Sequence, residues 1–291
     1  MIRFADTVSE KEVKQMWKTV FQDADSYMDI YFREKYRNEN TLVYFEGEKA
    51  VASLQMLSYQ FTFCDEEIPI AYLSGVCTLP EARKKGYMRE LLIRCMEVIC
   101  ERKISLAVLV PQEEWLLSFY QKFGFAQTFD AGTEELPSLK VLLESHSGDI
   151  STAYQEFDGW FRSKEMVVQK SIDDFRAIVE EAECFDFPAK KSLIGMARVV
   201  CPEILLSLFA KKYPKKSFSV NIQDPILAGN NALFTIQNSH VDKNETCVKP
   251  LFDIDIYGLT QLLLGYHTSE QKPAMDTFFP EKRPQMHFMM E

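Results

Sequence analysis

The sequence predicts an α/β protein in two unequal parts, a mixed-sheet domain followed by a smaller α+β domain. Its 291 residues suffice for about two domains at roughly 150 residues each. The first half alternates strand-like and helix-like patterns around a continuous apolar run at 106–110, which is typical of a buried central strand. The last third carries three short alternating segments beside two helical ones, the pattern of a smaller sheet packed on helices.

Composition and charge narrow the classes of function. Apolar residues make up 46% of the chain and charged residues 26%, as in ordinary globular proteins that bury a core. Lys plus Arg number 33 and Asp plus Glu 43, so the formal net charge is −10. Nucleic-acid binding needs a basic surface for phosphate contacts, so this charge argues against a nucleic-acid partner. It leaves cationic small molecules open as partners.

Three further features concern membranes, thiols and metals. No apolar run reaches the roughly 18–20 residues of a membrane span, and the N-terminus has no signal-peptide core. The seven cysteines are an odd number without a C-x-x-C pair, and the four histidines are scattered. We therefore expect a cytoplasmic protein with reduced thiols, no membrane partner and no metal site.

A helix and a meander open the first domain. Ser9 and Glu12 have the spacing of a capping box, and the apolar residues that follow have a helical period up to Phe21. A polar stretch rich in tyrosine comes next, over 23–40. Four predicted strands then form an antiparallel meander, at 41–45, 50–56, 60–64 and 68–78.

A strand–loop–helix–strand unit forms the centre of this domain. Pro80 ends the last strand of the meander, and a basic stretch leads into a helix that runs to about Arg102. The elements predicted beyond it are the buried strand at 106–110, a helix at 115–123 and a strand at 125–130. We place this domain at residues 1–133.

The remainder is divided into a connecting segment at 134–195 and a second domain at 196–291. Short helical pieces are predicted in the connecting segment at 157–161 and 172–179. The second domain begins with a helix from near Val200, because Pro202 suits a first helical turn. The other predicted elements are antiparallel strands at 218–222, 232–236 and 252–256, and a helix at 256–266.

The segment from Val76 to Met88 carries the clearest chemical signal. A strand ends, a basic loop follows, and a helix begins at Gly86. Free N–H groups at a helix N-terminus, together with the helix dipole, form an anion site suited to a pyrophosphate. Gly86 permits close approach of the backbone, and Arg83, Lys84 and Lys85 add positive charge. The alternative interpretation is a solvated basic turn.

This segment resembles the acetyl-CoA-binding motif of the GCN5-related N-acetyltransferase (GNAT) superfamily, Arg/Gln-x-x-Gly-x-Gly/Ala. Arg83, Gly86 and Met88 occupy its three positions, and Met88 departs from the usual small residue. The resemblance covers roughly residues 1–130 and implies a mixed-sheet GNAT domain with acetyl-CoA as cosubstrate. The residues it assigns to the coenzyme are Val76, Cys77, Thr78, Arg83, Lys84, Lys85, Gly86, Tyr87 and Met88.

The resemblance also implies a general acid. An alkylamine with a pKa of about 10 is only about one part in a thousand neutral at pH 7, so the enzyme must take one proton and supply another. Residues 118–125 resemble the aromatic ending of the family, in which a tyrosine faces the thioester. That tyrosine is Tyr120 here, with a plain core role as the alternative. A backbone N–H around Val76 to Thr78 would meet the oxyanion.

The second domain resembles the sterol-carrier-protein-type domain that closes the enhanced intracellular survival (Eis) acetyltransferases. The resemblance rests on Asp224-Pro225, the strand at 232–236 and the segment 259–266. Those relatives carry two GNAT-like domains before it, so residues 134–195 would be a reduced remnant of the second.

The Eis resemblance further implies a base at the C-terminus. In those relatives the terminal carboxylate reaches into the active site, which gives this role to the α-carboxylate of Glu291. The tail 286–290 is apolar for an unanchored terminus, which favours docking. His287 is the alternative base.

An acceptor wall is predicted at Asp23, Asp25, Tyr27 and Tyr31, where GNAT enzymes build one side of the pocket. Acids and aromatics suit a cationic amine, and a solvated loop is the alternative. We therefore predict a homo-oligomeric N-acetyltransferase that acts on a small cationic amine or a protein lysine. The rival hypothesis is a non-catalytic GNAT scaffold with a lipid- or partner-binding C-terminal domain.

Overall fold

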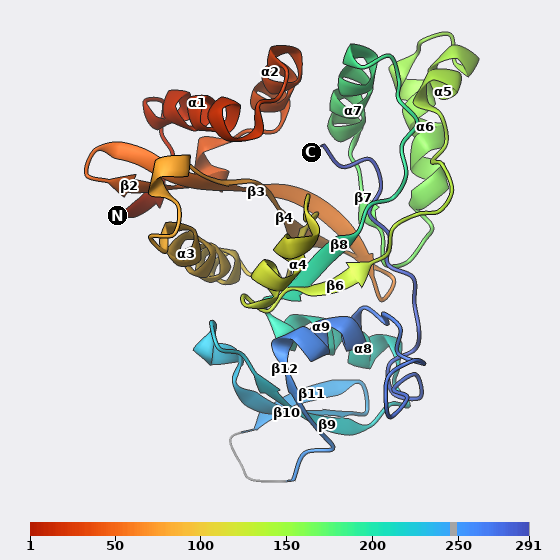
Figure 1. The fold of residues 1–291 in the computed structure, drawn as a ribbon. Coiled ribbons are helices and arrows are strands. Elements are labelled where there is room, and N and C mark those ends of the chain that lie inside the picture. Colours follow the sequence, from red (N-terminus) through yellow and green to blue (C-terminus); the bar gives the residue numbers. More distant parts are fainter. Residues whose placement is uncertain (245–248, 291) are drawn as a thin grey trace.

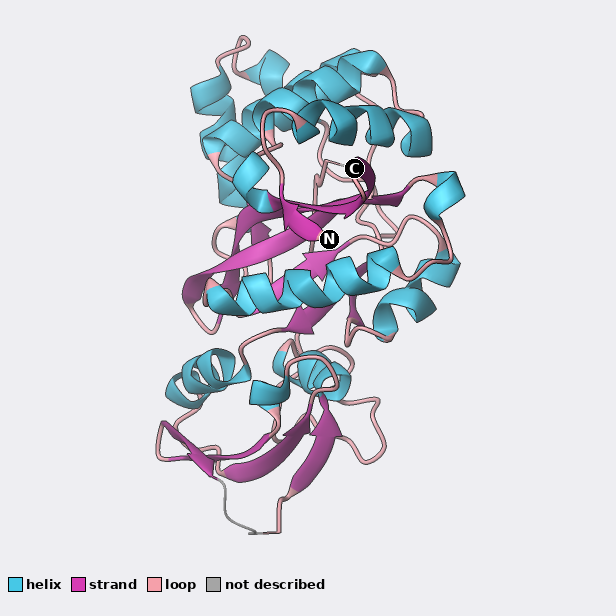
Figure 2. Cartoon of the chain, turned by 90° about the vertical axis from the view of Figure 1, so that its left-hand side faces the viewer, coloured by secondary structure: helices cyan, strands magenta, loops and turns pink. Residues whose placement is uncertain are grey.

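The computed structural model describes residues 1–244 and 249–290 and contains two sheets with helices between them (Figure 1). The larger sheet has the strand order β1-β2-β3-β4-β5-β8-β6, with β7 paired to β3, and the smaller has the order β11-β10-β9-β12. Figures 1 and 2 show α8 and α9 in the layer between the two sheets. The predicted fold class, a mixed-sheet α/β domain followed by a smaller α+β region, is confirmed.

The larger sheet carries helices on both faces, with α1 and α2 on one face and α3 and α4 on the other (Figure 1). Its strands are β1 (Ile2–Phe4), β2 (Thr41–Glu46), β3 (Lys49–Phe63), β4 (Glu66–Thr78), β5 (Leu106–Leu109), β6 (Ala126–Phe129), β7 (Val168–Gln169) and β8 (Gly195–Val199). The helices of this part are α1 (Ser9–Phe21), α2 (Asp25–Glu34), α3 (Tyr87–Glu101), α4 (Glu114–Gln121), α5 (Leu139–Ser145), α6 (Ile150–Phe161) and α7 (Ile172–Cys184). The smaller part contains α8 (Pro202–Lys212), β9 (Phe218–Gln223), β10 (Ala232–Gln237), β11 (His240–Asn244), β12 (Phe252–Asp255) and α9 (Ile256–Leu263).

The first helix forms as predicted, but the predicted capping box at Ser9 and Glu12 is wrong. The Asp6 carboxylate accepts the N–H groups of Val8 and Ser9 at 3.0 and 2.8 Å, and the Ser9 hydroxyl accepts the Asp6 N–H at 2.8 Å. The reciprocal pair therefore stands three residues earlier than the motif suggested. An aspartate satisfies the free N–H groups of a first turn as well as serine does.

The strands predicted at 50–56 and 60–64 are one continuous strand, β3, of 15 residues. Leu57 and Tyr59 are buried and Ser58 between them is exposed, so the alternation of a strand continues through the expected break. The antiparallel ladder with β4 runs along this length as far as Phe63 opposite Glu66. The end of β4 in this long β3–β4 pair carries the first residues predicted to bind the coenzyme.

Strand β8 was not predicted, and it lies between β5 and β6, one strand from the edge of the larger sheet. It pairs antiparallel with both β5 and β6, and Ala197 is the partner of Val108 on one side and Ala126 on the other. All of its residues are buried, including Arg198, whose charge interrupts the apolar pattern by which a central strand is recognised. The sheet therefore uses residues on both sides of the predicted boundary at 133.

The segment at 134–195 folds into α5, α6 and α7 and adds β7 to the larger sheet. The predicted helical pieces at 157–161 and 172–179 lie within α6 and α7, whereas α5 falls in a stretch expected to be a linker. Ser138 caps α5 and Asp149 caps α6 through their side chains. These polar residues make the segment resemble a loop when only its composition is considered.

The smaller sheet is mixed, which corrects the predicted antiparallel arrangement. β9 pairs antiparallel with β10 but parallel with β12. The chain passes from β11 at one edge to β12 at the opposite edge, and this crossing sets the parallel direction. Phe218, Val220 and Ile222 of β9 are buried, so this face of the sheet packs on the helices.

Candidate active site

A β-bulge interrupts β4 in the segment predicted to meet the coenzyme. The ladder with β3 shifts by one residue between Ser74 and Cys77, so Gly75 and Val76 together face Leu54. Gly75 has a φ of +58°, which glycine adopts without strain. A bulge leaves backbone groups outside the ladder and is common beside active sites.

β4 also loses its neighbour on the other side near this point. Its parallel ladder with β5 extends from Ile70 to Tyr72, whereas β4 itself continues to Thr78. β5 ends at Leu109, so the two strands separate beyond the paired region. The end of β4 is therefore bulged on one side and unpaired with β5 on the other.

The loop after β4 presents a row of free backbone N–H groups. Gly86 is the N-cap of α3 with a φ of +87°, and a Cβ built there meets no atom within 4 Å. Lys84 also has a positive φ of 63°. Within residues 1–244 and 249–290, the consecutive N–H groups from Lys84 to Arg89 have no acceptor. Such a row at a helix N-terminus binds anions.

The charged side chains of the loop are exposed, and two are tethered. Arg83 Nε donates to the Thr78 carbonyl at 3.3 Å, across the loop. Lys85 Nζ lies 3.1 Å from Glu46 Oε1, and the Tyr87 hydroxyl donates to the same carboxylate. Glu46 thus fixes the loop to the end of β2 but also offsets the charge of Lys85.

Tyr120 lies on α4, in the core cluster that includes buried residues of α3 and β5. Its side chain is buried, between Phe119 and Phe125 at ring distances of 5.2 and 5.9 Å. Burial, and then the neighbouring Cys77, raise the pKa of Tyr120 well above its ordinary value. The phenol therefore stays protonated at neutral pH, as a general acid must.

With this geometry, residues 1–128 match the model of the GNAT acetyltransferase domain family. This part of the chain is a GNAT acetyltransferase domain. Residues 205–278 match the family of sterol carrier protein domains. A comparison with curated proteins finds no match.

Solved structures share the architecture of the whole chain. Eis1 from Mycobacterium abscessus is 14% identical, with 98% of each chain covered and a TM-score of 0.66. A GCN5-related N-acetyltransferase from Anabaena variabilis is 16% identical over 98% of each chain, with a TM-score of 0.70. A probable N-acyltransferase from Enterococcus faecalis is 15% identical over the same share, with a TM-score of 0.66. At these identities the likeness establishes the fold.

Val76, Cys77 and Thr78 occupy the bulged end of β4 in the GNAT domain. Cys77 is buried with its Sγ 3.5 Å from Ser53 Oγ, and burial raises the pKa of its thiol to about 11. A protonated, buried thiol is a poor nucleophile, so Cys77 is a packing residue. Val76 and Thr78 are half-buried.

The predicted acceptor residues separate into two groups. Asp23 accepts the indole N–H of Trp17 at 2.6 Å, and Asp25 is exposed in an ion pair with Lys18. Tyr27 and Tyr31 are buried in the core on α2. Both acids therefore already have protein partners, and both tyrosines are core residues.

Sequence reasoning missed a buried polar group behind the bulge. The Tyr31 hydroxyl lies 3.0 Å from Gln55 Oε1 and 2.9 Å from Ser74 Oγ, and burial raises its pKa well above the ordinary value. Gln55 lies on β3, and the Gln55 Nε2 atom is 2.9 Å from where a Cβ of Gly75 would stand. These contacts tie α2 to the bulge. No local motif marks them, because the residues come from three separate elements.

The C-terminal tail docks on the segment that carries β7. Gln285 bridges to Val167 in parallel, with the Val168 N–H donating to the Gln285 carbonyl at 3.1 Å. The last described residue, Met290, is 1% exposed. In Figure 1 the dark blue tail leaves the smaller domain and runs along β7 toward α7. Docking of the tail was predicted, whereas Glu291, the predicted base, lies outside the described residues.

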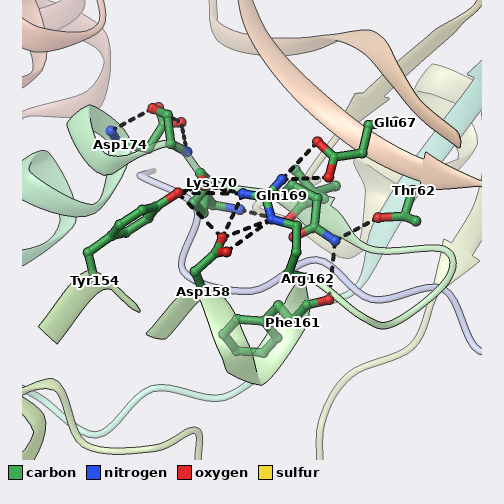
Figure 3. A network of polar contacts seen from close by, with 11 residues as sticks. Thr62, Glu67, Tyr154, Asp158, Phe161, Arg162, Gln169, Lys170 and Asp174 are labelled. Atoms are coloured by element: carbon green, nitrogen blue, oxygen red, sulfur yellow. Dashed lines mark hydrogen bonds and ion pairs between the residues drawn. The ribbon is translucent and has the colours of Figure 1, made fainter. Parts of the chain in front are cut away.

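A polar network holds the strand on which the tail docks (Figure 3). Arg162, the C-cap of α6, donates to Asp158 at 2.6 Å, to Glu67 at 2.7 Å and to the Lys170 carbonyl at 3.2 Å. Gln169 Nε2 donates to the Thr62 hydroxyl at 2.6 Å. These hydrogen bonds hold β7 against β3 and β4. The tail therefore docks on a strand that is itself held in place.

His287, the alternative base, is buried within this tail. Its Nδ1 lies 2.8 Å from Ser192 Oγ and its Nε2 3.2 Å from Gln285 Oε1. Burial, and then Lys170 and Lys164, lower its pKa to about 4. An imidazole with this pKa is a weak base whose two nitrogens are already engaged, so His287 serves the docking of the tail.

Other candidate sites lie away from the loop. A cavity of about 520 Å³ lies where the two parts of the chain meet, lined by Gln121, Gly124, Asp224 and Ile256 among others.

No described group of three or more His, Cys, Asp and Glu side chains could hold a metal ion. None of the helices in the described ranges has both the length and the apolar character to cross a membrane.

Proposed function

We propose that this protein is an acetyl-CoA-dependent N-acetyltransferase acting on a primary amine of a small cationic molecule or a protein lysine. The observation that carries the proposal is the row of free N–H groups from Lys84 to Arg89 at the start of α3. It follows a strand with a bulge and an unpaired end, within a GNAT acetyltransferase domain. The N–H row would hold the pyrophosphate of the coenzyme.

Acetyl-CoA supplies an acetyl thioester, and the chain supplies the surroundings of its carbonyl. The bulged segment Gly75-Val76 offers backbone N–H groups to the oxygen that becomes negative when the amine attacks. The C–N bond forms, the C–S bond breaks, and the thiolate takes the proton of Tyr120.

The proton of the attacking amine needs an acceptor. In this proposal it is the α-carboxylate of Glu291, the last residue of the tail. Support comes from the docking of residues 285–290 and from the low pKa of His287, which makes the rival base a poor one. The cationic class of the acceptor rests on the net charge of −10, since Asp23 and Asp25 are engaged with Trp17 and Lys18.

A thiol-release assay tests the activity. The full-length protein and acetyl-CoA are incubated with polyamines, aminoglycosides and lysine peptides, and free coenzyme A is measured with a thiol reagent. Release that depends on one acceptor class supports the proposal. Tight binding of CoA without release in any arm would overturn it and favour the non-catalytic scaffold.

A further inference from the structure

Cys100 and Cys201 meet although they lie 101 positions apart in the sequence. Cys100 is in the last turn of α3, and Cys201 is the N-cap of α8, where the chain leaves the larger sheet for the smaller one. The Cys201 thiol is 3.9 Å from the sulfur of Cys100, and both residues are half-buried. This pair has no part in the proposed acetyl transfer.

Backbone contacts hold the two cysteines in register. The N–H groups of Val200 and Cys201 both donate to the Ser105 carbonyl, at 2.8 and 3.3 Å. The turn that joins Cys100 to Ser105 is itself closed, since the Ile104 N–H donates to the Ile99 carbonyl at 3.1 Å. These backbone contacts hold the two thiols side by side.

The other described cysteines lack such a partner. Cys64, Cys77 and Cys95 are buried, and Cys184 is exposed on α7. Among the described sulfurs, Cys100 and Cys201 form the one pair joined by a sulfur–sulfur contact. Burial, and then the neighbouring Cys100, raise the pKa of Cys201 to about 12, which keeps this thiol protonated in the resting protein.

We propose that Cys100 and Cys201 form an oxidative modification site, which a peroxide converts to an intramolecular disulfide. The Cys100 thiolate attacks the peroxide, the O–O bond breaks, and a sulfenic acid and water are produced after proton transfer. The second sulfur then attacks the sulfenic sulfur, the S–S bond forms, and a second water leaves. Both cysteines are oxidised, the peroxide is reduced, and an added thiol restores the resting state.

The disulfide would join the end of α3 to the start of α8. These segments already touch in the reduced protein, so the bond adds a covalent link without a new arrangement. A cross-link that closes a long loop removes conformational freedom from the unfolded chain. The oxidised protein should therefore melt several degrees higher than the reduced one.

Peptide mapping of the full-length protein tests this site. The reduced protein is treated with hydrogen peroxide, free thiols are alkylated, and the digest is analysed without reductant. We expect a peptide pair joined at Cys100 and Cys201, lost on addition of dithiothreitol. Alkylation of both cysteines after oxidation, or a cross-link to a different cysteine, would overturn the proposal.

Matched variants and thermal melting complete the test. Cys201→Ser should abolish the cross-link, whereas Cys184→Ser, which removes an exposed thiol, should leave it intact. Cys100→Ala provides a second loss-of-pair variant if Cys201→Ser fails to fold. A higher melting temperature on oxidation, absent in the pair variants, supports the preformed geometry. A lower melting temperature would contradict it, because the bond would then strain the fold.

Discussion

Gly86 combines a left-handed backbone with open space above it. Gly86→Glu adds a side chain and a negative charge where the pyrophosphate would bind, so CoA affinity should fall at least about tenfold. Calorimetry measures this affinity for CoA. Gly148→Glu is the matched control, because Gly148 has a φ of +78° and an equally open Cβ position between α5 and α6. Equal CoA affinity in the two variants would refute the loop as the coenzyme site.

Tyr120 should matter for turnover more than for binding. Tyr120→Phe keeps the ring contacts with Phe119 and Phe125 and removes the proton, so kcat should fall by roughly 10²–10⁴ while CoA affinity is retained. Tyr213→Phe, a half-buried tyrosine of the smaller part, is the control. Near-normal turnover of Tyr120→Phe would leave Tyr120 as a core residue.

The proposed role of the C-terminal tail, to supply the base, can be tested by extending the chain. A short C-terminal extension displaces the terminal carboxylate, and acetyl transfer at pH 7 should fall while CoA affinity stays unchanged. Above about pH 9 the amine itself loses its proton more readily, so part of the deficit should be recovered. An N-terminal extension of the same length is the control. Equal activity of both tagged forms at pH 7 would exclude Glu291 as the base.

The docked tail also predicts a pH dependence of stability. The pKa of His287 is lowered to about 4 by burial, below its ordinary 6.5, so the unfolded chain binds the proton more readily. The contribution of His287 is complete above pH 6.5 and is lost as the pH falls toward 4, by up to about 3 kcal/mol. Denaturant unfolding at several pH values measures the free energy of unfolding. In His287→Gln this free energy should depend less on pH between about 4 and 6.5. An unchanged slope in His287→Gln would contradict it.

At the scale of the whole molecule, one buried ion pair joins the two sheets. Arg198 of β8 bonds both oxygens of Asp224, which follows β9, at 2.9 and 3.0 Å, and both side chains are fully buried. Asp224→Ala would leave the guanidinium without its counter-charge, at a cost of about 3–5 kcal/mol of unfolding free energy. Asp253→Ala, at an exposed carboxylate, is the control and should change it by less than about 0.5 kcal/mol. Chemical denaturation compares them, and equal stability of the two variants would contradict the prediction.

Much of the fold could be predicted because local patterns carry it. The helical period before Phe21, the glycine that opens α3 and the apolar run of β5 each lie within one short window. The anion loop was predicted for the same reason, since its strand, basic residues and glycine are contiguous. Such features depend on neighbours in the chain, which a sequence displays directly.

What failed depends on partners far away in the sequence. Arg198 gives β8 a polar centre, and only the carboxylate of Asp224 makes its burial possible.

The sequence alone therefore determined the α/β class and the strand–loop–helix unit, because helical period, strand alternation and glycine conformation are local properties. The tertiary structure decided that β8 completes the larger sheet, that the tail docks on β7 and that Cys100 meets Cys201. Each of these joins residues many positions apart, and such contacts arise from packing of the whole chain, which no short window contains.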